Sequence, residues 1–186
     1  METEIEAKFL DINSDSFRRI LNEKGAKLIH AERLMKRRNF DYPDSRLEKI
    51  GGWIRVRDEG DKITMTYKQR DDEFAMHGTK EIEVEVSDFD ATVKLLEAAG
   101  WPPITYQESK RETWKLGDTE IVLDEWPWIP PYIEVEAPSE QLVRETTEKL
   151  GFSWNDKVIG SIDVIYNRDF PNMNIRGVID IKEVRF

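Results

Sequence analysis

The sequence lacks cysteine altogether and contains only two histidines among its 186 residues. The absence of cysteine excludes disulfides, thiolate metal sites and a cysteine nucleophile. The two imidazoles, His30 and His77, are too few for a histidine-rich zinc centre. Any metal held by this chain would therefore need oxygen ligands.

Long apolar runs are also missing. No stretch approaches the roughly 20 apolar residues that a membrane-spanning helix needs. The chain begins directly with Met1-Glu2-Thr3-Glu4, without the basic and apolar regions of a secretory signal. We therefore expect a cytoplasmic protein that does not interact with membranes.

Charged residues, by contrast, make up 35% of the chain, with 38 acidic and 28 basic side chains and a net charge of −10. This balance speaks against nucleic acid as a partner, although an acidic protein can still enclose a local basic pocket. The length suits one domain with a substantial core.

Eight segments have the alternation, or the β-branched and aromatic content, of strands. They are residues 3–10, 33–41, 52–58, 62–69, 79–87, 106–116, 119–125 and 131–137. Three amphipathic segments, 14–24, 89–99 and 140–150, are each followed by glycine and predict helices. Because no glycine- or serine-rich linker divides the chain, the pattern predicts one α+β domain.

Three strand segments carry two glutamates separated by one apolar residue: Glu4-Ile5-Glu6, Glu81-Ile82-Glu83 and Glu134-Val135-Glu136. Successive side chains of a strand point to opposite faces, so each pair sends two carboxylates to one face. Neighbouring carboxylates repel each other unless water or cations surround them, which indicates open solvent or a bound metal with basic groups.

Cations alternate in the same way on two other strands. Arg55 and Arg57 lie opposite Ile54 and Val56, and Lys68 shares a face with two threonines. Two architectures account for this pattern: an open sheet whose polar face meets solvent, or a barrel with a polar lumen and helices on its outer wall. The periodicity alone leaves both open.

The segment Glu4-Ile5-Glu6-Ala7-Lys8 resembles the N-terminal Glu-x-Glu-x-Lys signature of the CYTH superfamily, the triphosphate tunnel metalloenzymes. The order of later elements strengthens the resemblance. These elements are Arg55-Val56-Arg57, Thr66-Tyr67-Lys68, Glu81-Ile82-Glu83, Lys110-Arg111-Glu112, Leu123-Asp124 and Tyr132-Ile133-Glu134-Val135-Glu136. The similarity spans about residues 1–165. It implies an eight-stranded antiparallel β-barrel, the triphosphate tunnel, with helices packed on its outside.

The resemblance also implies roles for individual residues. The expected triphosphate-binding set is Lys8, Arg37, Arg55, Arg57, Lys68 and Arg111, with Glu81 and Glu83 either lining the tunnel or orienting the arginines. Arg37 joins this set because it lies two residues before Asn39 in a strand that faces the same way. The expected ligands of Mg²⁺ or Mn²⁺ are Glu4, Glu6, Asp124, Glu134 and Glu136, since hard cations prefer oxygen. Glu4, Glu6 and Lys8 are the expected catalytic residues.

The implied activity is metal-dependent hydrolysis of inorganic triphosphate or a small organic triphosphate. Two alternatives remain: a class IV-type adenylyl cyclase, and a non-catalytic polyphosphate- or nucleotide-binding module. Many family members carry a lysine two residues before the counterpart of Arg111, whereas this chain has Ser109. That departure weighs against the cyclase. The oligomeric state is open between monomer and homodimer.

Three further segments are interpreted from composition and phase. Trp126, Trp128 and Tyr132 surround three prolines, which indicates a rigid aromatic loop that either packs or closes one tunnel mouth. Lys36, Arg38 and Lys110 have the opposite phase to their neighbours, so we expect them to face solvent. Residues 166–186 form a tail of unknown role that we expect to pack on the 1–165 domain.

Overall fold

The computed structural model describes residues 2–70, 79–172 and 180–186, with only the backbone given for residues 2–4 and 79. The strands are β1 (Glu2–Glu4), β2 (Glu6–Phe9), β3 (Lys27–Phe40), β4 (Gly52–Asp58), β5 (Ile63–Arg70), β6 (Thr79–Val86), β7 (Pro103–Leu116), β8 (Thr119–Glu125), β9 (Tyr132–Glu136) and β10 (Glu183–Val184). The helices are α1 (Ser14–Glu23), α2 (Phe89–Ala98), α3 (Glu140–Lys149) and α4 (Ile162–Asp169), with 3₁₀ turns η1 (Glu48–Ile50) and η2 (Trp154–Asp156).

The strands form one sheet in the order β1-β6-β5-β4-β3-β7-β8-β9-β2. Every neighbouring pair along this path is antiparallel. The two ends of the path, β1 and β2, are consecutive pieces of the N-terminal segment. Glu2–Glu4 pairs with β6, and Glu6–Phe9 pairs with β9. The N-terminal segment therefore joins both ends of the sheet and encloses a lumen.

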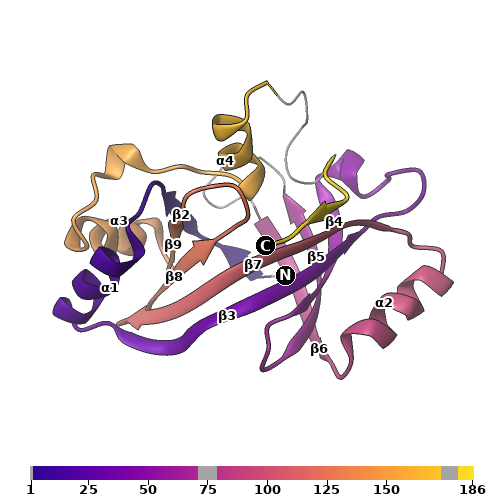
Figure 1. Ribbon diagram of the computed structural model, residues 1–186, viewed down its shortest axis with the longest axis horizontal. Helices are drawn as coiled ribbons and strands as arrows, with labels where there is room; N and C mark the ends of the chain where they lie inside the picture. The colour runs from indigo at the N-terminus through magenta and orange to yellow at the C-terminus, as the bar shows by residue number, and fades with distance from the viewer. Residues whose placement is uncertain (1, 71–78, 173–179) are drawn as a thin grey trace.

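Helices cover the outer wall at opposite ends of the sheet (Figure 1). Phe17 and Leu21 of α1 and Val143 of α3 pack with Phe9 and Ile121 in one apolar cluster. A second cluster forms where α2 packs on β4, with Leu96 against Phe40, Ile54 and Val56. Alternation explains this arrangement on β4, where Ile54 and Val56 face α2 while Arg55 and Arg57 face inward.

The predicted fold class is confirmed: the structure is α+β, with an antiparallel sheet and helices on its outside. The three predicted helices each match within a residue, and each is capped at its N-terminus by a side chain: Asn13, Asp88 or Ser139. The predicted first strand, 3–10, is divided at Ile5 because its two halves have different partners.

Two expectations need correction. The second strand was expected to begin at residue 33 but begins at Lys27. Register shifts between Leu28 and His30 and between His30 and Arg33 break its alternation, so period two cannot reveal it. The tail also contains structure that the sequence pattern did not show: α4 starts at Ile162, and β10 pairs in parallel with Tyr106 and Gln107 of β7.

The aromatic loop and α4 pack on each other. Trp126, Tyr132, Ile165 and Tyr166 form a third buried cluster, and the Tyr166 hydroxyl donates a hydrogen bond to the Pro127 carbonyl at 2.7 Å. This helix therefore lies over the segment that connects β8 to β9.

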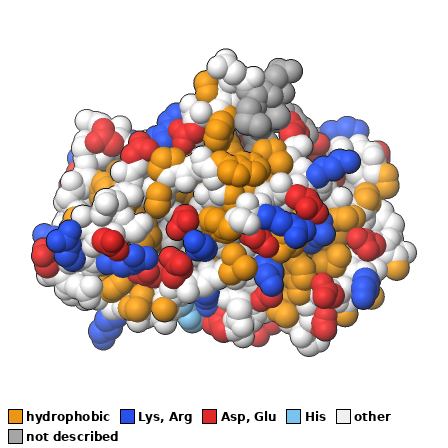
Figure 2. Space-filling model, viewed as in Figure 1, with side chains coloured by type: hydrophobic (Ala, Val, Ile, Leu, Met, Phe, Trp, Pro, Cys, Tyr) orange, Lys and Arg blue, Asp and Glu red, His pale blue; other side chains and the backbone are white. Residues whose placement is uncertain are grey.

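No helix in the described ranges is long and apolar enough to span a membrane. On the face shown in Figure 2, basic and acidic side chains are intermixed.

Gly51 shapes the turn between η1 and β4 and provides a test of the fold. It has φ +70°, and a Cβ there would lie 2.2 Å from the Arg70 carbonyl oxygen. We expect Gly51→Ala to lower the free energy of unfolding by on the order of 3 kcal/mol, because strain and backbone overlap add. Gly25 is the matched control: it has φ +77° but nothing within 4 Å of the added Cβ. Gly25→Ala should cost only about 1–2 kcal/mol. Urea denaturation of both variants measures this difference, and equal losses would contradict the packing account.

Candidate functional site

The lumen contains a cavity of about 760 Å³, lined by side chains from eight of the strands and from α4. Its cations come from five strands: they are the six that were predicted, Lys8, Arg37, Arg55, Arg57, Lys68 and Arg111, and Arg70 of β5, which was not predicted. Its carboxylates include the predicted Glu6, Glu81, Glu83, Asp124, Glu134 and Glu136. The predicted residues whose side chains are described therefore all line one cavity. Glu4 is the exception, because its side chain lies outside the described part.

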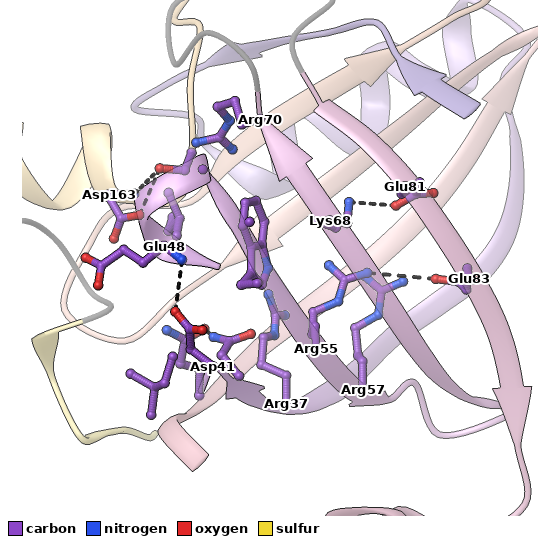
Figure 3. A pocket seen from close by; sticks show the side chains of 18 of the residues that line it. Arg37, Asp41, Glu48, Arg55, Arg57, Lys68, Arg70, Glu81, Glu83 and Asp163 are labelled. Carbon is purple, nitrogen blue, oxygen red and sulfur yellow. Dashed lines mark hydrogen bonds and ion pairs between the residues drawn. The ribbon is translucent and has the colours of Figure 1, made fainter. Parts of the chain in front are cut away.

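One wall of the cavity consists of cations in register on adjacent strands. Arg57 pairs across the sheet with Arg37, and Trp53 pairs with Lys68. Arg37, Arg55 and Arg57 lie side by side, with Lys68 and its partner Glu81 on the neighbouring strands (Figure 3). Four cations on one wall form a surface that attracts a polyanion.

The opposite wall, formed by β2, β7, β8 and β9, holds cations that are tightly paired with carboxylates. The Lys8 ammonium lies 2.5 Å from a Glu6 oxygen and 3.2 Å from a Glu134 oxygen. Arg111 donates to both oxygens of Asp124, at 2.7 and 2.5 Å, and to Glu134 at 2.9 Å. Lys8 and Glu6 share β2, whereas the other pairs join different strands, so the network connects β2, β7, β8 and β9 within the lumen.

The ionisation of these groups follows from the pairing. Burial alone would raise the pKa of Glu134, but Lys8 and Arg111 outweigh it and lower that pKa to about 2. Burial likewise opposes the charge on Lys8, yet Glu134 and Glu6 hold its pKa above the ordinary value. Burial, with Asp124 and Glu134 nearby, raises the pKa of Tyr132 well above its usual range. Glu134 and Lys8 are therefore charged at neutral pH, while Tyr132 keeps its proton.

Arg37 is the exception among the cations. It is 7% exposed, and no described carboxylate forms a salt bridge with it. Its guanidinium donates to the Ser109 hydroxyl and lies 4.4 Å from the centroid of the Trp126 ring, while its Nε has no hydrogen-bond partner among the described residues. Burial, together with the nearby Arg57 and Arg111, lowers the pKa of Arg37 to about 10. A buried guanidinium without a counterion makes this point of the cavity selective for an anion.

The remaining cations of the wall are oriented by acceptors on the same or neighbouring strands. Lys68 contacts Glu81 at 2.9 Å. Thr66 donates to Glu83 at 2.9 Å and accepts from Arg55 at 3.5 Å. Glu81 and Glu83 therefore do both things that were expected as alternatives, since they line the cavity and also hold its cations.

Glu59 was missed by the sequence reasoning. It is 4% exposed, and one of its oxygens accepts from both Nε and Nη2 of Arg57, at 2.9 and 2.5 Å. Arg33 lies on its other side, at 3.7 Å. Because Glu59 follows β4 in a turn, strand alternation could not place it. It fixes the direction of the Arg57 guanidinium.

Glu120 was also missed, although a sequence signal for it exists. It lines the cavity and lies four residues before Asp124 on β8, hence on the same face. Register places Glu120 beside Glu136 on β9, and Glu136 beside Glu6 on β2. Carboxylates directly opposite one another destabilise a sheet unless a cation lies between them.

The adjacent carboxylates of Glu120, Glu136 and Glu6 are hard oxygen donors, the ligands that Mg²⁺ or Mn²⁺ prefers. Asp124 differs from them, because it is fully buried and both of its oxygens accept hydrogen bonds from Arg111. Within the described side chains, no three acidic or imidazole groups are gathered closely enough to hold a metal ion. The assignment of Glu6, Asp124, Glu134 and Glu136 to a metal stays a prediction, as does that of Glu4.

The aromatic loop has two parts with different positions. Trp126 and Tyr132 line the cavity but are almost fully buried, at 3% and 1% exposed. Trp128 is exposed, at 56%, and packs edge-on with Tyr166.

Lys36, Arg38 and Lys110 lie on the outer face as expected, but half-buried: Arg38 stacks on Tyr106, and Lys110 lies over Phe186.

Comparisons with known proteins agree with this geometry. The model of the CYTH domain matches residues 2–162, and the chain therefore belongs to the CYTH family. Comparison with curated protein sequences found no match.

Solved structures share the fold. A conserved hypothetical protein from Pyrococcus furiosus is 22% identical, with 83% of this chain and 94% of that chain covered and a TM-score of 0.69. A protein from Vibrio parahaemolyticus, provisionally described as an adenylate cyclase, is 15% identical, with coverage of 88% and 97% and a TM-score of 0.77. A protein from Hippeastrum, provisionally an adenylyl cyclase and described as having a dominant triphosphatase activity, is 14% identical, with coverage of 81% and 88% and a TM-score of 0.56.

The pairing of Glu134 yields a prediction about pH. Its pKa is lowered on folding, so the stabilisation is complete above the unfolded value near 4.5 and is lost as pH falls toward the folded value of about 2. We expect wild type to lose on the order of 3 kcal/mol of unfolding free energy over this window relative to Glu134→Gln. The control is Glu148→Gln, which breaks only an exposed pair on α3 and should have little effect at any pH. Denaturant titrations between pH 7 and 2 measure this, and parallel pH curves for wild type and Glu134→Gln would contradict the pairing.

Proposed function

We propose that this protein hydrolyses a triphosphate in the lumen of its sheet, with Mg²⁺ or Mn²⁺ as cofactor. Arg37 supports the proposal most strongly. A guanidinium that is buried, stacked on Trp126 and without a carboxylate among the described residues is stabilised when an anion binds. Its neighbours Arg55, Arg57 and Lys68 extend the same wall, so a chain of phosphates has several cations to contact.

The carboxylates of the opposite wall would bind the metal ion. Glu6 and Glu134 are held by Lys8 and Arg111 in the structure, and they are the groups that would bind a divalent cation, together with Glu136 and Glu4. A bound divalent cation supplies charge neutralisation at the phosphates and lowers the pKa of a bound water. With these carboxylates holding a divalent cation, Lys8 and Arg111 would be free to contact the phosphates.

The protein's own residues hold the substrate and stabilise its charge. The arginines present planar forks that match phosphate oxygens. Lys8 contacts Glu6, one of the carboxylates that were expected to be catalytic. Phosphoryl transfer needs little beyond such positioning and charge stabilisation.

Hydrolysis is proposed in preference to cyclisation because of Ser109. Where many family members have a lysine, Ser109 is fully buried and accepts a hydrogen bond from Arg37. The site therefore has one cation fewer, and Arg37 is hydrogen-bonded to Ser109 of β7. The description of the Hippeastrum protein as a dominant triphosphatase is consistent with this reaction in the same fold.

Arg37→Met tests the proposal, with Arg38→Met as its matched control. The two residues are adjacent on β3, but Arg37 lines the cavity and Arg38 stacks on Tyr106 outside it. We expect Arg37→Met to raise KM for triphosphate about 10- to 100-fold, because a charge-assisted contact is worth about 1.5–3 kcal/mol. The melting temperature should not fall, since an unpaired buried charge is removed.

The measurement is phosphate release from inorganic triphosphate, thiamine triphosphate and ATP, with Mg²⁺, with Mn²⁺ and with chelator. Formation of cyclic AMP from ATP without matching phosphate release would contradict hydrolysis. Equal kinetics for wild type and Arg37→Met would show that the Arg37 guanidinium does not contact the substrate. Binding without turnover under any metal would favour the non-catalytic module.

A further inference from the structure

The charge of Arg37 is compensated in a different way from that of its neighbour Arg57. The Arg57 guanidinium is held by the Glu59 carboxylate, which accepts two of its N–H groups. Arg37 instead lies against an indole ring, with its guanidinium carbon 4.4 Å from the centroid of Trp126. Among the residues that the structure describes, only Ser109 accepts a hydrogen bond from Arg37. The aromatic face therefore attracts the cation and leaves most of its five N–H groups for an anion.

The orientation of Trp126 depends on packing. Trp126 follows the last residue of β8, lies two residues after Asp124, and lines the cavity. Its side chain is almost fully buried, and its Nε1 has no hydrogen-bond partner among the described residues. Because no hydrogen bond fixes the indole, the side chains that pack around it decide where its ring faces.

The cluster around Trp126 includes residues of the C-terminal tail, 166–186. Tyr166 of α4 and Val184 of β10 are fully buried and belong to this cluster. The Tyr166 ring lies edge-on to the indole, with 6.4 Å between the centroids and 79° between the ring planes. Its hydroxyl group donates to the carbonyl of Pro127, the residue that follows Trp126. The tail therefore packs on the same ring that stacks on Arg37.

The tail is anchored to the rest of the chain at two places. Arg168 of α4 donates to both carboxylate oxygens of Asp11, each at 2.9 Å. Val184 of β10 pairs in register with Gln107 of β7, which is itself a cross-strand partner of Arg37. These contacts give the tail a defined position beside the strand that faces Arg37.

We propose that the C-terminal tail completes the phosphate clamp: Tyr166 fixes Trp126, and Trp126 positions the Arg37 guanidinium for an anion in the lumen. Trp126 is a positioning residue, because it acts through Arg37. The inference rests on the proposed function, which supplies the anion. Without the ring, the guanidinium would turn toward a carboxylate of the lumen, and a carboxylate that accepts its N–H groups competes with phosphate.

Calorimetric titration with inorganic triphosphate in the presence of chelator measures the Kd without turnover. We expect Trp126→Leu to raise the Kd about tenfold, the size of a partly desolvated cation–π contact. Trp126→Phe keeps an aromatic face and should recover most of the affinity. Trp114→Leu is the matched control, because Trp114 is also buried but packs in the outer cluster with α1. It should lower the melting temperature and leave the Kd unchanged.

A double-mutant comparison separates positioning from a general structural role. If Trp126 acts through Arg37, Trp126→Leu should change the Kd little in an Arg37→Met background. Tyr166→Leu alters no residue that lines the cavity and should raise the Kd about threefold, the size of one edge-on aromatic contact. That rise should also disappear in the Arg37→Met background. Melting temperatures show which variants are folded, and Tyr166→Leu carries the test if Trp126→Leu does not fold.

Two results would overturn the inference: an unchanged Kd in the folded Trp126 and Tyr166 variants, or equal rises with and without the Arg37 guanidinium. In the first case, a raised Kd in Arg37→Met shows that the clamp stands and that the tail only packs on it. Failure of the proposed function looks different. Wild type then binds no triphosphate, Arg37→Met matches it, and this inference falls as well.

Discussion

Charge pairing across strands inside the sheet is the constraint on which the rest of this structure depends. A lumen lined by lysines, arginines, aspartate and glutamates is costly to bury unless most of its charges are compensated as they leave water. Lys8 between Glu6 and Glu134, and Arg111 between Asp124 and Glu134, compensate the wall of β2, β7, β8 and β9. On the facing wall, Glu81 and Glu59 compensate Lys68 and Arg57. Helices α1, α2 and α3 then bury the apolar outer faces, so the polar interior and the apolar exterior are two results of the same alternation.

The same pairing explains how a protein with a net charge of −10 can attract a polyanion. Its cations are concentrated where the strands face one another, while the surface in view mixes both signs (Figure 2). Arg37 lacks a described carboxylate, so an anion improves its environment at once. Lys8 and Arg111 are already paired with carboxylates, so under the proposed function they would contact phosphate only where those carboxylates held a metal ion instead. Substrate and metal would then promote each other's binding.

Much of this fold and site could be predicted from the sequence, because period two is visible in single strands. It placed Arg55, Arg57 and Lys68 on one face, and the order of motifs placed the six cations in one lumen. The failures have physical reasons. Bulges in β3 break the alternation after Lys27, and α4 packs through a cluster with Trp126 and Tyr166 that no local pattern predicts. Glu59 lies in a turn, where side-chain direction depends on the fold. Glu120 had the correct phase, but its place beside Glu136 depends on strand register, which only the structure shows.

The central claim is that linked phosphates bridge the cations of the lumen, and thermal unfolding tests it most directly. Melting curves would be recorded with saturating inorganic triphosphate and with the same phosphorus concentration of orthophosphate, at equal ionic strength and Mg²⁺ concentration. A ligand that binds only the folded state raises the melting temperature by mass action. The account predicts a clear rise with triphosphate and a much smaller one with orthophosphate, because only the linked anion spans Arg37, Arg55 and Arg57. Equal shifts, or none with either anion, would contradict it.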